Sequence, residues 1–189
     1  INITLDSKET ILEEIKKYLN FNSKLKTSNE NKRTKPFVIV TPNPEQVVYA
    51  QSHPMFVKVL NQADVAIPDG VGIVWGAQVL KTKNLKLQTT VRYKRIAGVD
   101  FMEDLVLMAA KQGVRIGLIG GRAGLADKSL ECLQKNYHGL EGWAEEGPTM
   151  KIQSTNNSQK IIDTEQYIQE LARRIEKTKP QMVFVGLGA

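Results

Sequence analysis

The chain contains very little cysteine and few aromatic residues. Its one cysteine, Cys132, excludes an internal disulfide framework and is typical of a reducing compartment. Cys132 lies in a helical pattern, and we expect it to pack as a small apolar residue. Aromatic residues make up 6% of the 189 residues, whereas 41% are hydrophobic. These proportions predict a globular protein whose core is built mainly from Val, Ile and Leu.

Long apolar runs and metal-binding patterns are also lacking. No stretch of about 18 consecutive apolar residues is present, which excludes a membrane-spanning helix. Asp6, Glu9 and Glu13 interrupt the N-terminal segment, so it does not read as a signal peptide. His53 and His138 have no Cys or Glu at ligand spacing, and no Asp-x-Asp pair occurs. We therefore expect no metal and no cofactor.

Basic residues exceed acidic ones, giving a formal net charge of +6. This charge favours an anionic partner, which can be a nucleic acid, a phosphorylated metabolite or an acidic membrane surface. Residues 81–95 contain Lys81, Lys83, Lys86, Arg92, Lys94 and Arg95 and no acidic residue. A solvated surface is the usual explanation of such a run. Arg95 differs from the others because it borders the apolar start of a helix.

Periodicity predicts an α/β fold that is Rossmann-like, with a mainly parallel sheet and helices on both faces. We expect residues 1–35 to form an amphipathic helix and a polar linker packed on the same domain, and residues 36–189 to form the α/β domain. The expected strands are 37–40, 65–67, 114–119, 182–185 and a short one near 140–143. The expected helices are 7–19, 44–60 with a break at His53-Pro54, a buried one at 70–80, 98–112, 125–137 and 161–179.

Two successive strands of this pattern end in small polar or acidic residues. Thr41 and Asn43 follow the first strand, and Asp69 follows the second. Ligands of open α/β sheets bind at the carboxyl ends of the strands, so these three side chains can line one pocket. Asp69 can then act as a general base, or it can cap the helix that starts near Gly72. Thr41 and Asn43 can bind a sugar or carboxylate, or can simply form a turn.

A second candidate site is the glycine-rich turn from Gly120 to Gly124, between a strand and a helix. Glycines let the backbone approach a phosphate, and the helix N-terminus offers unpaired N–H groups. Arg122 adds a positive charge within the turn. The alternative is that the glycines serve only close packing of the helix on the sheet, because the full dinucleotide fingerprint is absent.

Five ordered motifs together resemble the WecG/TagA/CpsF family of bacterial glycosyltransferases, from about Pro36 onward. They are Thr41-Pro42-Asn43-Pro44-Glu45, Ala63-Asp64 followed by Pro68-Asp69-Gly70-Val71-Gly72, Arg95-Ile96-Ala97-Gly98-Val99-Asp100, Leu118-Ile119-Gly120-Gly121, and Val185-Gly186-Leu187-Gly188-Ala189.

The resemblance implies an inverting transfer of an N-acetylhexosamine, commonly N-acetylmannosamine, from a UDP-sugar to a polyprenyl-diphosphate-linked N-acetylglucosamine. Such a transfer belongs to wall teichoic acid, enterobacterial common antigen or capsule synthesis. By position, Asp69 resembles the catalytic base, Thr41 and Asn43 the pocket residues beside it, and Arg95 the arginine near the diphosphate. The residues expected to bind substrate are Gly70, Gly98, Asp100, Gly120, Gly121, Arg122, Gly124, Gly186 and Gly188.

The family resemblance also carries expectations about location and partners. The family works at the cytoplasmic face of the bacterial membrane, so we expect a peripheral protein there, and a homo-oligomer is compatible with this location. We expect the natural protein to continue beyond Ala189, and its membrane contact to lie in that further segment. The basic segment 81–94 is longer than the family pattern predicts, and it suits a lid, an acceptor contact or an inert insertion. The alternative function is a nucleotide- or nucleic-acid-binding module that uses residues 81–95.

Overall fold

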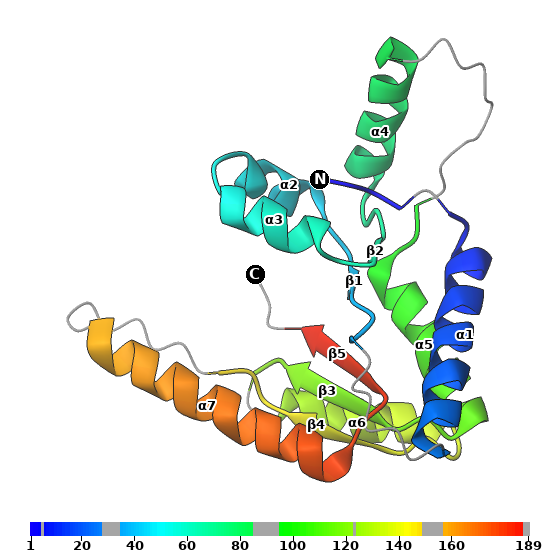
Figure 1. Cartoon of the computed structure of the whole chain (residues 1–189), viewed down its shortest axis with the longest axis vertical. Helices are drawn as coiled ribbons and strands as arrows, with labels where there is room; N and C mark the ends of the chain where they lie inside the picture. The colour runs from blue at the N-terminus through cyan, green and yellow to red at the C-terminus, as the bar shows by residue number, and fades with distance from the viewer. Residues whose placement is uncertain (5, 28–34, 85–94, 123, 149–156, 187–189) are drawn as a thin grey trace. The chain divides into compact units, whose positions relative to one another are not determined.

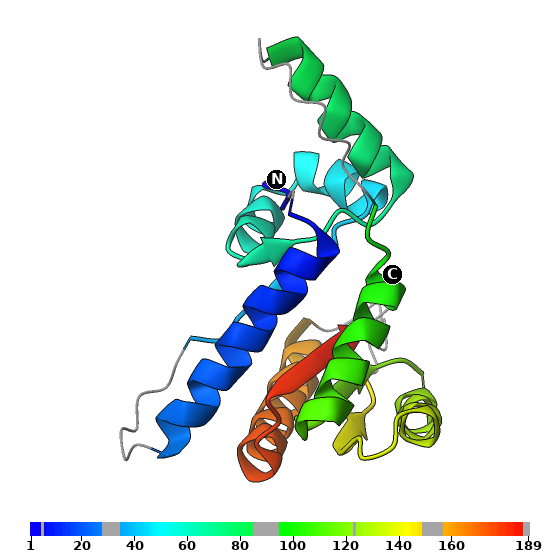
Figure 2. The same ribbon diagram turned by 90° about the vertical axis from the view of Figure 1, so that its right-hand side faces the viewer.

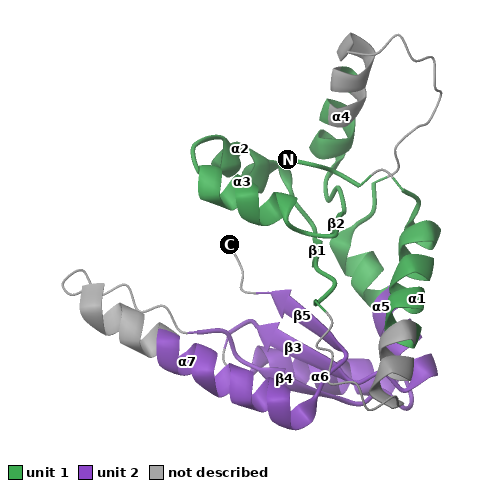
Figure 3. Cartoon of the chain, in the orientation of Figure 1, with its two compact units in different colours: residues 1–103 green, residues 104–189 purple. Residues whose placement is uncertain are grey.

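The structure is a computed structural model that describes residues 1–4, 6–27, 35–84, 95–122, 124–148 and 157–186 (Figure 1). Within the helices, the side chains of residues 21–27, 77, 78, 80–84 and 157–164 are not described. The chain forms two compact units, Ile1–Glu103 and Asp104–Ala189 (Figure 3). Each unit has its own parallel sheet.

The first unit is built around two short parallel strands, β1 (Ile39–Val40) and β2 (Val65–Ala66). Ile39 pairs with Val65 and Val40 with Ala66. The N-terminal segment adds to this sheet, because the Thr4 backbone N–H donates to the Ala66 carbonyl oxygen at 2.9 Å. Its helices are α1 (Lys8–Thr27), α2 (Pro44–Gln51), α3 (Pro54–Asn61) and α4 (Val71–Asn84), and α5 (Gly98–Gln112) begins in it. Its buried side chains include Ile11, Ile15, Leu60, Ile67 and Phe101.

The second unit contains a three-stranded sheet in the order β4-β3-β5. Both pairings of the central strand β3 (Ile116–Gly120), with β4 (Gly142–Glu145) and with β5 (Met182–Gly186), are parallel. Every residue of β3 is buried, as expected for the middle strand of a covered parallel sheet. The helices α6 (Leu125–Asn136) and α7 (Asn157–Thr178) complete the connections between the strands.

Two neighbouring residues of β4 show that α6 and α7 cover opposite faces of this sheet (Figure 2). A Cβ on Gly142 would meet Leu130 of α6 at 3.2 Å. The next residue, Trp143, lies beneath the guanidinium of Arg174 from α7, with 5.1 Å from Cζ to the ring centroid. Successive side chains of a strand point to opposite faces, so the two helices lie on different sides of the sheet.

The parallel α/β architecture predicted from periodicity is confirmed, but its strands are divided between two sheets. The predicted break at His53-Pro54 is also correct, because α2 ends before it and α3 begins at Pro54. Helix α1 extends through residue 27, where a polar linker was expected, and residues 28–34 of that linker lie outside the described residues. None of the described helices is long and apolar enough to cross a membrane.

Two burial predictions are wrong. Helix α4 was expected to be buried, yet Val71 and Trp75 are 71% and 67% exposed. Its sequence is apolar all round, a pattern that normally indicates a core helix. Cys132 was expected to pack inside the protein, but it lies on the exposed side of α6 as a free cysteine.

Candidate active site

The turns that follow β1 and β2 lie side by side because backbone pairing continues beyond both strands. The Ile67 N–H donates to the Val40 carbonyl oxygen at 2.8 Å, and the Asp69 N–H donates to the Pro42 carbonyl oxygen at 3.2 Å. Pro42 is fully buried, so the first turn is anchored in the core. Thr41 and Asp69 are thereby held at the same edge of the sheet, as the strand pattern predicted.

The first residue of α5 closes this group from a third segment of the chain. A Cβ added to Gly98 would lie 3.3 Å from Oδ2 of Asp69 and 3.4 Å from Cγ2 of Thr41. Only a residue without a side chain leaves both neighbours undisturbed at this distance. The predicted site residues Thr41, Asp69 and Gly98 are therefore in one place, and the N-terminus of α5 begins beside the Asp69 carboxylate.

Arg95 faces the other oxygen of the same carboxylate. Its Nη2 lies 3.5 Å from Oδ1 of Asp69, with 52% of the Arg95 side chain and 32% of the Asp69 side chain exposed. Both charges therefore remain in contact with solvent, and the pair is a loose one. This geometry leaves the guanidinium donors of Arg95 able to bind an anion while the carboxylate stays accessible.

Asn43 caps helix α2. The sequence pattern alone could not distinguish this role from substrate binding. Its side-chain oxygen accepts the Gln46 backbone N–H at 2.8 Å, and the Gln46 side-chain oxygen accepts the Asn43 N–H at 3.3 Å. These two bonds form a capping box at the start of α2, with Pro44 in the first turn. The Asn43 side chain thus stabilises the turn that presents Thr41.

The other predicted residues of the first unit lie around this group. Gly70 continues the turn from Asp69 into α4, and its carbonyl oxygen accepts the Val74 N–H at 3.4 Å. Asp100 is exposed in the first turn of α5, where a negative charge favours the helix N-terminus. Within the described residues, the Asp69 carboxylate makes no hydrogen bond to an N–H of α4. Its expected alternative role as the cap of α4 is therefore not observed.

The glycine turn of the second unit is closely packed against β5. Gly120 ends β3 with φ +126°, and a Cβ there would come within 2.0 Å of the Gly186 carbonyl oxygen of β5. The Gly121 N–H donates to that same oxygen at 3.1 Å. Gly120 therefore allows the two strand ends to approach closely, while Gly188 lies outside the described residues.

The start of α6 already holds an anionic group from this chain. The Gly124 N–H donates to Oε1 of Glu146 at 2.6 Å. Glu146 is held in turn by α7, because the Tyr167 hydroxyl donates to its backbone oxygen at 2.8 Å. Burial and then the nearby Glu145 carboxylate raise the pKa of the Tyr167 hydroxyl above its ordinary value. Arg122 is exposed in the turn, and the sequence carried no signal for the Glu146 contact.

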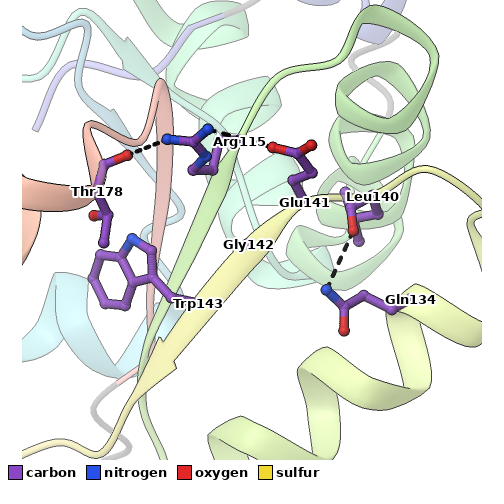
Figure 4. A pocket seen from close by; sticks show the side chains of 7 residues that line it. All are labelled: Arg115, Gln134, Leu140, Glu141, Gly142, Trp143 and Thr178. Atoms are coloured by element: carbon purple, nitrogen blue, oxygen red, sulfur yellow. Dashed lines mark hydrogen bonds and ion pairs between the residues drawn. The ribbon is translucent and has the colours of Figure 1, made fainter.

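A cavity of about 420 Å³ opens at the opposite, amino end of the strands of the second unit (Figure 4). It is lined by Arg115, Gln134, Leu140, Glu141, Gly142, Trp143 and Thr178. Arg115 spans it, with Nη1 2.5 Å from the Thr178 carbonyl oxygen and Nη2 3.4 Å from Glu141. Ligands of parallel sheets bind at the carboxyl ends of the strands, so this cavity is not where we place the chemistry.

Comparison with known proteins agrees with the motifs assembled in the first unit. The chain is 28% identical over 164 residues to an N-acetylglucosaminyldiphosphoundecaprenol N-acetyl-beta-D-mannosaminyltransferase from Staphylococcus aureus strain MRSA252. It is 27% identical over 164 residues to the protein of the same name from strain NCTC 8325 / PS 47. Each match covers 87% of this chain and 56% of the relative, so the chain spans little more than half the length of these relatives. The family model described as "Glycosyl transferase WecG/TagA/CpsF family" matches residues 15–189, and the chain therefore belongs to that family.

Proposed function

We propose that this protein transfers N-acetylmannosamine from a UDP-sugar to a polyprenyl-diphosphate-linked N-acetylglucosamine, with inversion at the anomeric carbon and with Asp69 as the general base. The observation that carries the proposal is the position of the Asp69 carboxylate, which lies between Thr41, Arg95 and the N-terminus of α5. It is part-exposed at the carboxyl end of a parallel pair of strands, where an acceptor can reach it.

The reaction needs one proton acceptor and one source of positive potential. A carboxylate oxygen of Asp69 takes the proton from the acceptor hydroxyl as the hydroxyl oxygen attacks the anomeric carbon. The bond from that carbon to the diphosphate oxygen breaks in the same step, and its electron pair leaves with UDP. A single displacement of this kind inverts the configuration at the anomeric carbon.

Arg95 and the start of α5 supply the positive potential in this proposal. The guanidinium donates in a planar fork that matches phosphate oxygens, and the loose contact with Asp69 leaves it free to turn toward them. Backbone N–H groups in the first turn of α5 carry partial positive charge. Positive groups placed where charge develops stabilise the transition state most. The hydroxyl of Thr41 can hold a sugar oxygen beside the base.

The substrates in this proposal follow the printed names of the relatives. Those names specify an acceptor in which N-acetylglucosamine is joined through a diphosphate to undecaprenol, and an N-acetylmannosaminyl group as the group transferred. The UDP donor is our own inference, because a diphosphate leaving group suits the cationic surroundings of Asp69. An undecaprenyl acceptor resides in a membrane, so we also propose that the protein works at a membrane surface.

The decisive experiment replaces Asp69 with asparagine in the full natural protein. Asp69→Asn keeps the size and the hydrogen-bonding shape of the side chain but removes the proton acceptor. We expect transfer from UDP-N-acetylmannosamine to a short-chain lipid acceptor to fall by about 10² to 10⁴-fold, with thermal unfolding unchanged. Asp127→Asn, which removes an exposed carboxylate from the first turn of α6, is the matched control. Near-normal turnover of Asp69→Asn would refute the role of Asp69.

A further inference from the structure

We propose that α4 docks this protein on an anionic lipid bilayer, with Val71 and Trp75 as the residues that enter the interface. These two residues form the α4 face. This surface is distinct from the residues that carry the proposed transfer reaction.

The α4 face exposes two apolar side chains to solvent. Val71 is 71% exposed and Trp75 is 67% exposed. Residues four apart lie on the same side of a helix, so the two side chains are neighbours. Tryptophan combines a large apolar ring with one N–H donor, and it is enriched where membranes meet water. Leaving both side chains in water is unfavourable, and insertion among lipid headgroups removes that cost.

A basic stretch follows the apolar residues of α4 in the sequence. Residues 71–95 contain six Lys or Arg residues and no Asp or Glu. An anionic leaflet attracts basic residues near its surface by about 1 kcal/mol each. Apolar insertion and electrostatic attraction therefore act from one segment of the chain.

These observations favour a bilayer over a nucleic acid as the anionic partner. Nucleic acids need basic side chains and, for single strands, aromatic rings on which bases stack. Residues 71–95 contain only two aromatic residues, Trp75 and Tyr93, and the exposed residues of α4 include an aliphatic one, Val71. An exposed valine adds no affinity for a phosphate backbone, whereas its transfer from water into a lipid interface lowers the free energy of the system.

The position of α4 connects this surface with the proposed reaction. Helix α4 begins two residues after Asp69, so the α4 face and the proposed base belong to one continuous turn. Docking through α4 brings this turn to the membrane surface, where a lipid-linked acceptor presents its sugar. This connection rests on the proposed function, whereas binding to a bilayer does not require it.

Vesicle sedimentation without any sugar substrate tests the proposal independently of catalysis. The probe is a vesicle of phosphatidylglycerol and phosphatidylcholine, compared with phosphatidylcholine alone. We expect binding to the anionic vesicle only, and a roughly tenfold weaker partition coefficient for Trp75→Ser. Ile168→Ser is the matched control, because Ile168 is 56% exposed on α7 of the second unit. Equal losses for the two variants, or equal binding to neutral vesicles, would overturn the proposal.

A charge variant separates the bilayer from other partners. We expect Lys81→Gln combined with Lys83→Gln to weaken anionic binding by roughly 30-fold at low salt, while Lys128→Gln with Lys135→Gln on α6 has a much smaller effect. Binding of single-stranded RNA that is tighter than vesicle binding and insensitive to Trp75→Ser would overturn the proposal. So would a lower oligomeric state of Trp75→Ser in solution. If vesicle binding persists while Asp69→Asn keeps its turnover, only the proposed function fails.

Discussion

Gly98 and Asp69 are in contact although 29 positions separate them in the chain. A Cβ on Gly98 would stand 3.3 Å from Oδ2 of Asp69 and would also touch Thr41. The start of α5 is therefore fitted against two residues that end neighbouring strands. A methyl group is enough to disturb this arrangement, and its effect on activity can be separated from its effect on stability.

We predict that Gly98→Ala impairs transfer without unfolding the protein. The methyl group must displace the Asp69 carboxylate by a few tenths of an ångström, and small misplacements of reacting groups are costly in rate. We expect kcat to fall roughly tenfold, while helix propensity at this position improves. Gly76→Ala is the control, because a Cβ on Gly76 has no neighbour within 4 Å. Equal kinetics for the two variants would contradict the prediction.

A pair of substitutions at Asn43 distinguishes the helix cap from a substrate contact. Asn43→Ala removes the bond to the Gln46 N–H, and we expect the free energy of unfolding to fall by about 1 kcal/mol. Asn43→Ser keeps a capping oxygen and should retain most of this stability. Chemical denaturation measures the loss of the helix cap, and KM for the donor measures the loss of a substrate contact. Wild-type kinetics in Asn43→Ser would show that the amide serves only as a cap.

Gly120→Ala should destabilise the second unit severely. The methyl group would lie 2.0 Å from the Gly186 carbonyl oxygen, and φ of +126° is itself unfavourable for alanine. We expect a loss of about 3 kcal/mol or more in the free energy of unfolding. Gly113→Ala is the matched control, because Gly113 also has a positive φ, +64°, but no atom within 4 Å of a Cβ. A similar small loss in both variants would show that strand packing at Gly120 is not tight.

The sequence predicted that the polar residues after the first two strands lie close together, because parallel strands have their carboxyl ends at the same edge of a sheet. That rule located Thr41 and Asp69 and did not depend on any distant contact. It could not separate the capping role of Asn43 from substrate binding, since both need a short polar side chain after a strand. Nor could it predict the contact between Glu146 and Gly124, because a loop carboxylate at a helix N-terminus leaves no periodic signal.

Helix α4 shows a different limit of pattern reading. An all-round apolar sequence indicates burial, because burial is the usual way to remove apolar surface from water. The same sequence also suits a helix whose partner is outside the chain. The exposed fractions of Val71 and Trp75 distinguish these cases, and only the folded structure supplies them. The division of the strands between two sheets was likewise hidden, because it depends on which strands pair.

Tyr167→Phe should change how stability depends on pH. Burial raises the pKa of the Tyr167 hydroxyl, so the folded state holds this proton more tightly than the unfolded state does. The stabilisation is complete below about pH 10 and is lost as the pH rises through the folded value. At pH 7 the variant should be about 1 kcal/mol less stable, because the bond to the Glu146 oxygen is gone.

The difference between Tyr167→Phe and the wild type should then shrink as the pH rises above about 10. Urea denaturation at each pH measures it, and the comparison within each pH cancels the titration of all other groups. A difference that stays constant across this range would contradict the assigned pKa shift. Tyr137→Phe provides a control in the same unit, because Tyr137 lies at the end of α6, away from the Glu146 contact.

The two tryptophans of the chain are divided between the two units, and this division has an experimental use. Trp75 is 67% exposed, whereas Trp143 is 7% exposed beneath Arg174 and against Gly117. Intrinsic fluorescence should therefore contain a red-shifted, quencher-accessible component from α4 and a blue-shifted, protected one from the sheet of the second unit. The emission of Trp143 therefore reports the unfolding of the second unit without an attached dye, whereas that of Trp75 reports whether a partner covers α4.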